Sequence, residues 1–276
     1  MIYEGDALMK KALVITTNEV QKRLCDVLSK RGLSADGVEA FDNKIKKDKI
    51  RVYDMLVLPF APKEKKPSFL PEGALLGDYL SHGQLVVGGM FSDGLIKEIE
   101  GKQGEYADYF SNEAYVLKNA YITSQGALRL LLETTSDFLV GKKVLITGFG
   151  RIGKSLAGML KAIGMKVFVA VRSEIAATEA AACGFEVFKI SQTASTLFYY
   201  DYIFNTVPER IFEKNHIKHI RDDAYYFELA SFPFGADKAD FSACDKHFVN
   251  GSALPGRYFS LAVAENMAAF IFSLGR

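Results

Sequence analysis

Three glycines near the middle of the chain have a spacing that could hold phosphate groups. They follow an apolar run at 143–147 and precede an amphipathic stretch at 154–163, so they lie between a predicted strand and a predicted helix. Gly148 would allow the tight turn, Gly150 would leave the backbone open to a pyrophosphate, and Gly153 would let the helix pack closely on the sheet. The dipole and amide groups at the start of that helix would attract the phosphates. This context favours a dinucleotide site over a glycine-rich turn that binds nothing. The predicted turn comprises Gly148, Phe149, Gly150, Arg151, Ile152 and Gly153.

The residues after the next predicted strand, 165–171, bear on which dinucleotide would bind. Arg172 and Ser173 follow it, and no acidic residue occurs before Glu174. NAD sites usually place an Asp or Glu here to bind the ribose 2′-hydroxyl. A guanidinium instead suits a 2′-phosphate, and a serine hydroxyl could donate a further hydrogen bond. The sequence therefore favours NADP, and the alternative is that the arginine merely begins a surface loop.

Two further predicted strands, within 202–208 and 224–231, end in small or polar residues. Ligands of open α/β sheets bind beyond the carboxyl ends of the strands. Ordinary strand-to-loop transitions are the alternative interpretation of both strand ends. The residues predicted to line the nicotinamide side of the site are Thr206, Val207, Pro208, Ala230 and Ser231.

The first half of the chain shows the same alternation of apolar runs and amphipathic stretches. Runs at 12–16, 55–58 and 84–87 predict buried parallel strands. Asn18 is predicted to cap a helix, and Gly32 is predicted to end it. The whole chain is therefore predicted to be an α/β protein.

The region between the two halves sets the predicted domain boundary. Residues 101–119 are predicted to be a polar and aromatic connector, and 124–138 to be a helix. We accordingly predict one domain over 1–120 and a dinucleotide-binding domain over 121–276. The apolar helix predicted at 260–274 must be buried against a domain or a second copy of the chain, so a homo-oligomer is expected.

Composition excludes several functional classes. Among 276 residues, 34 Lys and Arg face 33 Asp and Glu, a net charge of +1, which gives no basic surface for nucleic acid or for a membrane. Three widely spaced cysteines exclude a disulfide framework and a four-cysteine zinc site within one chain. No metal site is expected. The first residues lack a signal-peptide pattern, so a cytoplasmic protein is expected.

Six motifs occur in the order in which they are found in the dipicolinate synthase A family, and residues from 105 to 276 resemble that family. The resemblance implies a two-domain fold similar to D-2-hydroxyacid dehydrogenases, in which a Rossmann doubly wound parallel sheet accompanies a smaller flavodoxin-like domain and the C-terminal helix packs back. It also implies an NADP-dependent step that forms dipicolinate from a dihydro- or tetrahydrodipicolinate precursor in sporulating bacteria, with the flavoprotein dipicolinate synthase B as partner. The six motifs are 119–126, 148–153, 170–173, 205–208, 228–231 and 254–256.

The substrate side matches the family less well than the cofactor side. Ile122 and Gln125 stand where the family usually has proline and glutamate, and Glu228 stands where it has aspartate. A changed substrate is therefore left open. The residues proposed to bind a small dicarboxylate are Thr123, Gln125 and Arg257, and the alternative for the arginine is a plain surface position.

The sequence assigns no catalytic residue. The histidines at 82, 216, 219 and 247 are interpreted as structural, because none has a carboxylate partner that the pattern can place. Three functions remain: the dipicolinate synthase A reaction, another NADP(H)-dependent dehydrogenase of the hydroxyacid type, or a non-catalytic module that binds NADPH.

Overall fold

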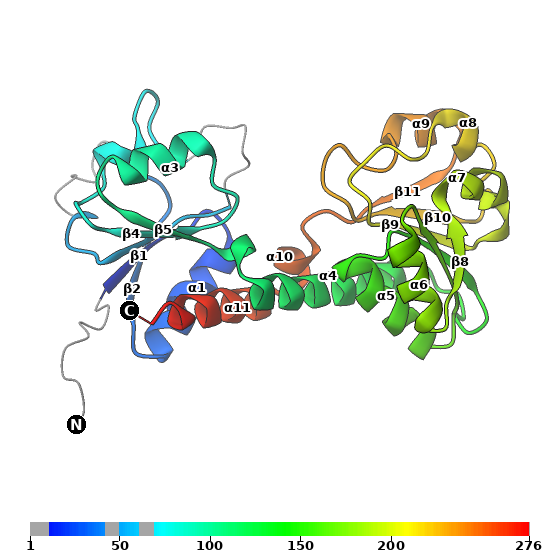
Figure 1. Ribbon diagram of the computed structural model, residues 1–276, viewed down its shortest axis with the longest axis horizontal. Coiled ribbons are helices and arrows are strands. Elements are labelled where there is room, and N and C mark those ends of the chain that lie inside the picture. Colours follow the sequence, from blue (N-terminus) through cyan, green and yellow to red (C-terminus); the bar gives the residue numbers. More distant parts are fainter. Residues whose placement is uncertain (1–10, 42–49, 61–68, 276) are drawn as a thin grey trace. The chain divides into compact units, whose positions relative to one another are not determined.

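The computed structural model describes residues 11–41, 50–60 and 69–275, and it contains two compact α/β units (Figure 1). One unit combines Met1–Asn119 with Phe259–Arg276, and the other is Ala120–Tyr258. The sequence placed the boundary one residue later, after 120, and placed the C-terminal helix in the second domain. That helix belongs to the first unit because it packs on the first helix of the chain.

The first unit contains a parallel sheet of five strands in the order β2-β1-β3-β4-β5. This is the strand order of flavodoxin-like folds, which confirms the fold expected for this half of the chain. The strands are β1 (Lys11–Ile15), β2 (Ser34–Val38), β3 (Met55–Val57), β4 (Leu85–Gly88) and β5 (Glu105–Asp108). The helices of this unit include α1 (Glu19–Lys30), α3 (Asp93–Glu100) and α11 (Ser260–Ser273), with 3₁₀ turns at Leu76–Asp78 and Tyr109–Ser111.

Helix α1 begins and ends where the sequence predicts. The side chain of Asn18 accepts a hydrogen bond from the Val20 amide, and Gly32 has a φ of +93° just beyond the last turn. Helix α11 packs against α1, as the ribbon shows (Figure 1). The guanidinium of Arg31 lies 4.2 Å from the ring centroid of Phe272 and closes the end of this contact. The apolar C-terminal helix is thus buried within the first unit.

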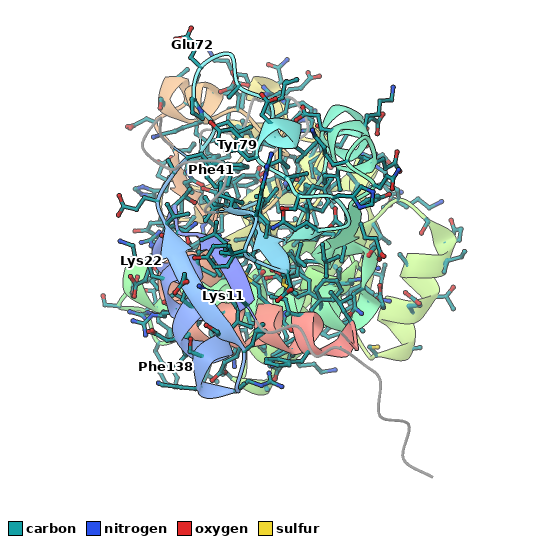
Figure 2. The ribbon with its side chains drawn as sticks, turned by 90° about the vertical axis from the view of Figure 1, so that its left-hand side faces the viewer. Lys11, Lys22, Phe41, Glu72, Tyr79 and Phe138 are labelled. Carbon is teal, nitrogen blue, oxygen red and sulfur yellow. The ribbon has the colours of Figure 1, made fainter. Side chains whose placement is uncertain are left out.

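The core of the first unit is continued by aromatic side chains from its loops. Phe41 and Tyr79 stack with their ring centroids 4.8 Å apart (Figure 2). Phe69 packs edge-on against Phe41 at 6.0 Å. These rings join the apolar side chains of the strands in a single buried cluster.

The predicted connector at 101–119 is wrong. It contains β5 and the first turns of α4 (Glu113–Thr134), which also ends four residues before the predicted 138. Strand β5 lacks an apolar run because it is an edge strand whose Glu105 and Tyr106 are exposed. The amide of Tyr115 donates to Asn112 Oδ1 at 2.9 Å, a cap at the true start of the helix.

The second unit contains a parallel sheet of six strands in the order β11-β10-β9-β6-β7-β8. Counted from β6, this is the 3-2-1-4-5-6 order of a doubly wound Rossmann sheet read from its far edge, which confirms the predicted fold. The strands are β6 (Lys143–Thr147), β7 (Lys166–Val171), β8 (Glu186–Lys189), β9 (Tyr202–Asn205), β10 (Tyr225–Glu228) and β11 (His247–Asn250). Besides most of α4, the helices are α5 (Arg151–Ala162), α6 (Glu174–Ala182), α7 (Ile190–Thr193), α8 (Lys214–Ile217), α9 (Lys238–Ala243) and α10 (Leu254–Tyr258), with a 3₁₀ turn at Ala194–Tyr199.

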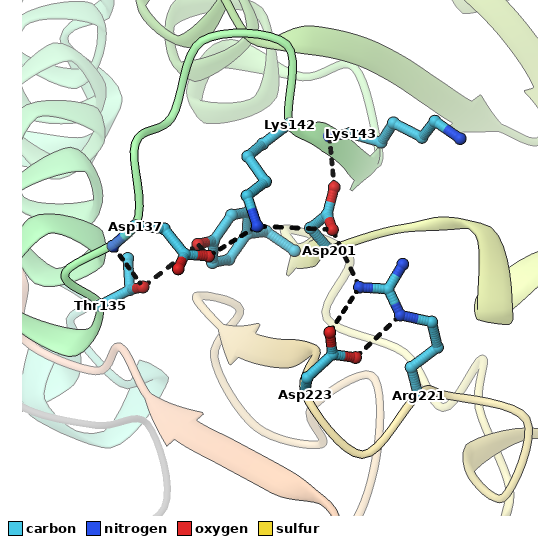
Figure 3. A network of polar contacts seen from close by, with 8 residues as sticks. Thr135, Asp137, Lys142, Lys143, Asp201, Arg221 and Asp223 are labelled. Carbon is cyan, nitrogen blue, oxygen red and sulfur yellow. Dashed lines mark hydrogen bonds and ion pairs between the residues drawn. The ribbon is translucent and has the colours of Figure 1, made fainter.

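A polar network joins the amino ends of the central strands of this sheet (Figure 3). Asp201 accepts hydrogen bonds from the Lys143 amide at 2.7 Å and from Arg221 at 2.9 Å. Asp137 accepts from the Tyr202 hydroxyl at 2.7 Å. The network fixes the edge of the sheet opposite to the carboxyl ends of the strands, where a ligand is expected. In the parts of the chain that the structure describes, no helix is long and apolar enough to cross a membrane.

Candidate functional site

The glycine turn after β6 has the geometry that its spacing predicts. Gly148 has a φ of +90°, and its amide donates to the Ala170 carbonyl of β7 at 2.8 Å. A Cβ at 148 would lie 2.6 Å from Thr206 Oγ1, and a Cβ at 153 would lie 2.3 Å from the Gly148 carbonyl oxygen. The fold itself therefore requires glycine at both positions. Gly148 has a left-handed backbone and no room for a Cβ, and a Cβ at Gly153 would collide with a main-chain atom.

Gly150 differs from its two neighbours, because a Cβ placed there would meet no atom within 4 Å. It is the N-cap of α5, it offers no side chain to the helix amides, and the first turn of α5 carries no acidic residue. The positive end of the helix dipole therefore faces open space with no carboxylate beside it in this turn. These features fit the phosphates of a dinucleotide.

Of the other residues of the turn, Phe149 and Ile152 pack on the apolar core. Phe149 is buried and packs edge-on against Phe185 with the ring centroids 5.7 Å apart. Ile152 packs on the same apolar core, and its carbonyl lies 3.1 Å from Ser124 Oγ on α4. The side chain of Arg151 is exposed.

The end of β9 lies directly beside the glycine turn. The amide and the hydroxyl of Thr206 both donate to the Thr147 carbonyl of β6, at 3.0 and 2.8 Å. The Val207 amide donates to Asn205 Oδ1 at 3.1 Å, and Pro208 follows. The structure therefore brings Thr206 and Val207 together with the turn, at the point between β6 and β9 where the strand order reverses.

The predicted residues after β10 lie one strand farther along the same edge. Ala230 is buried, and its amide donates to Glu228 Oε1 at 3.0 Å. Ser231 is exposed. Ala230 is thus held by the sheet, whereas the side chain of Ser231 is available to a ligand.

A buried carboxyl group at the end of β10 organises this edge, and the sequence assigned it no role. Besides the Ala230 amide, Glu228 accepts hydrogen bonds from the Asn205 side chain at 2.7 Å, the Tyr226 hydroxyl at 2.9 Å and the Gly235 amide at 2.8 Å. Burial raises the pKa of this carboxyl, and its four hydrogen bonds oppose that shift. The sequence signal that could have revealed this role is an acidic residue at the end of an otherwise apolar strand. The chemical role that the contacts support is to hold the 229–235 loop in place.

A pocket of about 420 Å³ lies where the structure places Arg172 and Ser173, beyond the end of β7. Ser173 caps α6 by accepting a hydrogen bond from the Ala176 amide at 3.2 Å. Arg172 is half exposed and forms an ion pair with Glu209. The pocket is lined by Val171, Arg172, Ser173, Glu174, Ala177, Thr178, Ala181, Val187, Phe188, Lys189 and Gln192.

The residues proposed to bind substrate do not form one cluster. Thr123 is buried on α4, and Gln125 is exposed on the same helix. Arg257 is exposed on α10, with its guanidinium 4.8 Å from the ring centroid of Tyr258. The Tyr258 hydroxyl donates to Glu133, near the C-terminal end of α4. These contacts place Arg257 toward that end of the helix, away from Thr123 and Gln125.

Two of the histidines have structural contacts. His247 begins β11 at the amino edge of the sheet and stacks on Tyr225 with centroids 4.6 Å apart. The Nδ1 atom of His216 accepts a hydrogen bond from the Glu213 amide at 3.2 Å and caps α8. Across residues 11–41, 50–60 and 69–275, no group of three or more His, Cys, Asp or Glu residues could hold a metal ion.

Residues 119–251 match a protein-family model described as the NAD binding domain of S-adenosyl-L-homocysteine hydrolase. The matched segment contains all six strands of the second sheet and the glycine turn. The chain has a nicotinamide dinucleotide-binding fold.

Comparison with solved structures covers both units. The crystal structure of dipicolinate synthase A from Bacillus halodurans aligns with a TM-score of 0.80 and 21% identity, over 96% of this chain and 97% of that one. This agreement confirms the resemblance that the sequence motifs predicted, at the level of the fold.

Sequence comparison with curated proteins covers less. Dipicolinate synthase A of Bacillus subtilis is 24% identical over 147 residues, which is 53% of this chain and 48% of that protein. S-inosyl-L-homocysteine hydrolase of Methanocaldococcus jannaschii is 33% identical over 124 residues, 44% of this chain and 29% of that protein. In both cases the chain matches less than half of the relative's length.

Proposed function

We propose that the chain is an NADP-dependent oxidoreductase of the dipicolinate synthase A type. The observation that carries the proposal is the open backbone at Gly150, at the strand-order reversal between β6 and β9, together with an arginine in place of an acid after β7. An open, positively polarised helix start suits a pyrophosphate, and the arginine suits a 2′-phosphate.

Three groups of residues would hold the dinucleotide. The backbone of the Gly148–Gly153 turn would receive the pyrophosphate. Arg172 would pair with the 2′-phosphate in the pocket after β7, and the Ser173 hydroxyl, whose oxygen already accepts from α6, retains its own hydrogen to donate. The ends of β9 and β10 would border the nicotinamide through Thr206, Val207, Pro208, Ala230 and Ser231.

The chemistry that a bound nicotinamide supplies is hydride transfer. Conversion of a dihydrodipicolinate ring to dipicolinate removes one hydride and one proton, which fits an NADP⁺-linked step. The residues of this chain would position the reacting groups, and Glu228 holds the 229–235 loop. A dicarboxylate would also need hydrogen-bond donors. Of those expected from the sequence, Gln125 is exposed on α4, Thr123 is buried on the same helix, and Arg257 lies toward the other end of that helix. We further propose that the protein acts in the cytoplasm of a sporulating bacterium, as a homo-oligomer, with the flavoprotein dipicolinate synthase B as partner.

Calorimetric titration of the full chain with NADPH and with NADH tests the cofactor assignment. We expect NADPH to bind more tightly, and equal affinities would refute the preference for NADP. Turnover is tested by incubating the chain, alone and with a dipicolinate synthase B protein, with NADP⁺ and freshly generated dihydrodipicolinate. Production of NADPH and dipicolinate would support the proposal. Binding without turnover of any dicarboxylate or hydroxyacid would favour a module that senses NADPH, and turnover of a 2-hydroxyacid alone would favour the other dehydrogenase class.

A second candidate is suggested by the match of residues 119–251 to the hydrolase family model. Under this alternative, the second unit would bind NAD and support hydrolysis of an S-nucleosyl homocysteine. Release of homocysteine from S-adenosyl- or S-inosyl-homocysteine in the presence of NAD⁺ would support it. The arginine after β7 favours the first candidate, because a site for NAD usually has an acid there.

A further inference from the structure

Arg172 and Glu209 form an ion pair that crosses the end of the central strand of the second sheet. Arg172 directly follows β7, Glu209 follows β9, and β6 lies between these two strands. Neighbouring strands are about 4.8 Å apart, so the ends of β7 and β9 are separated by about 10 Å. The glycine turn follows β6, the strand between them. The pair therefore joins the two sides of the proposed dinucleotide site.

The carboxylate of Glu209 pairs with the guanidinium of Arg172, which is the cation proposed to bind a 2′-phosphate. The side chains of Arg172 and Glu209 are 47% and 59% exposed, so an incoming ligand can reach both. A carboxylate and a phosphate make the same kind of charge-assisted hydrogen bonds to a guanidinium, and one can replace the other. The other cation that lines this pocket, Lys189, also has a carboxylate partner, Glu174 at 3.2 Å.

We propose that Glu209 sets the preference of this site between NADP and NAD by holding Arg172 when no 2′-phosphate is present. This inference rests on the proposed function. NADP must displace the carboxylate of Glu209 and then bind with that negative charge still close to its phosphate. NAD carries a ribose hydroxyl at this position and leaves the ion pair intact. Glu209 therefore weakens the discrimination that Arg172 alone would provide.

The substitution Glu209→Gln tests the proposal, because it removes the charge and keeps the size of the side chain. We expect it to tighten NADPH binding about fivefold, since an exposed ion pair is lost and a like charge near the phosphate disappears. The affinity for NADH should change by less than about twofold. Isothermal titration at one low ionic strength measures both, and added salt should reduce the difference between the variant and the parent.

Glu174→Gln is the matched control, because it removes a charge from a paired glutamate at the same pocket without touching the partner of Arg172. A gain for NADPH of equal size in both variants would show a general charge effect and overturn the proposal. So would an unchanged affinity for NADPH in Glu209→Gln, or a loss of NADH affinity, which would make Glu209 a ribose ligand instead. Failure of the parent chain to bind either dinucleotide would refute the proposed function itself, whereas binding by the parent with no response to Glu209→Gln would refute only this inference.

Discussion

Substitution of Gly150 by alanine should abolish most dinucleotide affinity without harming the fold. The added Cβ meets no protein atom within 4 Å, and the φ of −80° is one that alanine adopts without strain. The methyl group would instead occupy the space in which a pyrophosphate must approach the start of α5. Displacement of one charge-assisted hydrogen bond from an amide to phosphate costs about 1.5–3 kcal/mol. At about 1.4 kcal/mol per tenfold change, the dissociation constant should rise about 10- to 150-fold.

Gly158 provides the matched control for this experiment. It lies on the same helix, and a Cβ there also meets no atom within 4 Å. Gly158→Ala should bind dinucleotide as the parent chain does and should be more stable by about 0.5–1 kcal/mol, because alanine favours a helix interior. Calorimetric titration gives the affinities, and urea denaturation monitored by circular dichroism gives the stabilities. If Gly150→Ala retains its fold and binds NADPH and NADH as tightly as Gly158→Ala does, the turn is not the phosphate site.

Other contacts in the second unit lead to three more testable outcomes. Gly153→Ala should lower the free energy of unfolding by about 1–3 kcal/mol, because its Cβ would lie 2.3 Å from the Gly148 carbonyl oxygen; unchanged urea stability would contradict this packing. Arg172→Ala should weaken NADPH binding about 5- to 30-fold in titration and NADH binding much less. This range extends below the usual cost of losing a charged hydrogen bond because the group is half exposed. Equal losses of affinity for the two dinucleotides would disprove the role of Arg172. The hydrogen bonds from Arg221 hold the pKa of Asp223 below its ordinary 3.8, so their stabilisation is present above that pH and is lost as the pH falls below it. The melting temperature of Asp223→Asn should therefore fall less between pH 5 and pH 3 than that of the parent, and parallel losses in calorimetric scans would refute the linkage.

Much of the architecture was predictable from local pattern. The apolar runs at β1, β3, β4 and β6 are fully or almost fully buried, and a buried parallel strand has to be continuously apolar. Asn18 and Ser173 cap the N-termini of α1 and α6, and these hydrogen bonds depend only on neighbours along the chain. Strand β5 escaped prediction because an edge strand with exposed side chains has no such pattern.

The candidate site was predictable in its backbone and only partly in its side chains. The requirement for glycine at 148 and 153 arises from the strand, turn and helix that the sequence itself specifies, and the fold places Thr206 against that turn as expected. Arg257 was grouped with Thr123 and Gln125 because a dicarboxylate needs a cation and hydrogen-bond donors. Its contact with Tyr258 and its place near Glu133 depend on how α10 crosses α4, which no local pattern encodes.

Sequence alone therefore determined the buried strands, the parallel α/β class and a glycine turn shaped for phosphates, because backbone conformation and side-chain periodicity are local properties. Tertiary structure alone decided that Glu209 pairs with Arg172, that Glu228 ties together β9, β10 and the following loop, and that α11 packs on α1. Asn205 and Glu228 are 23 positions apart along the chain, and α1 and α11 are more than 200 positions apart. Such contacts form only after the strands have taken their order in the sheet and the C-terminal helix has returned to the first unit.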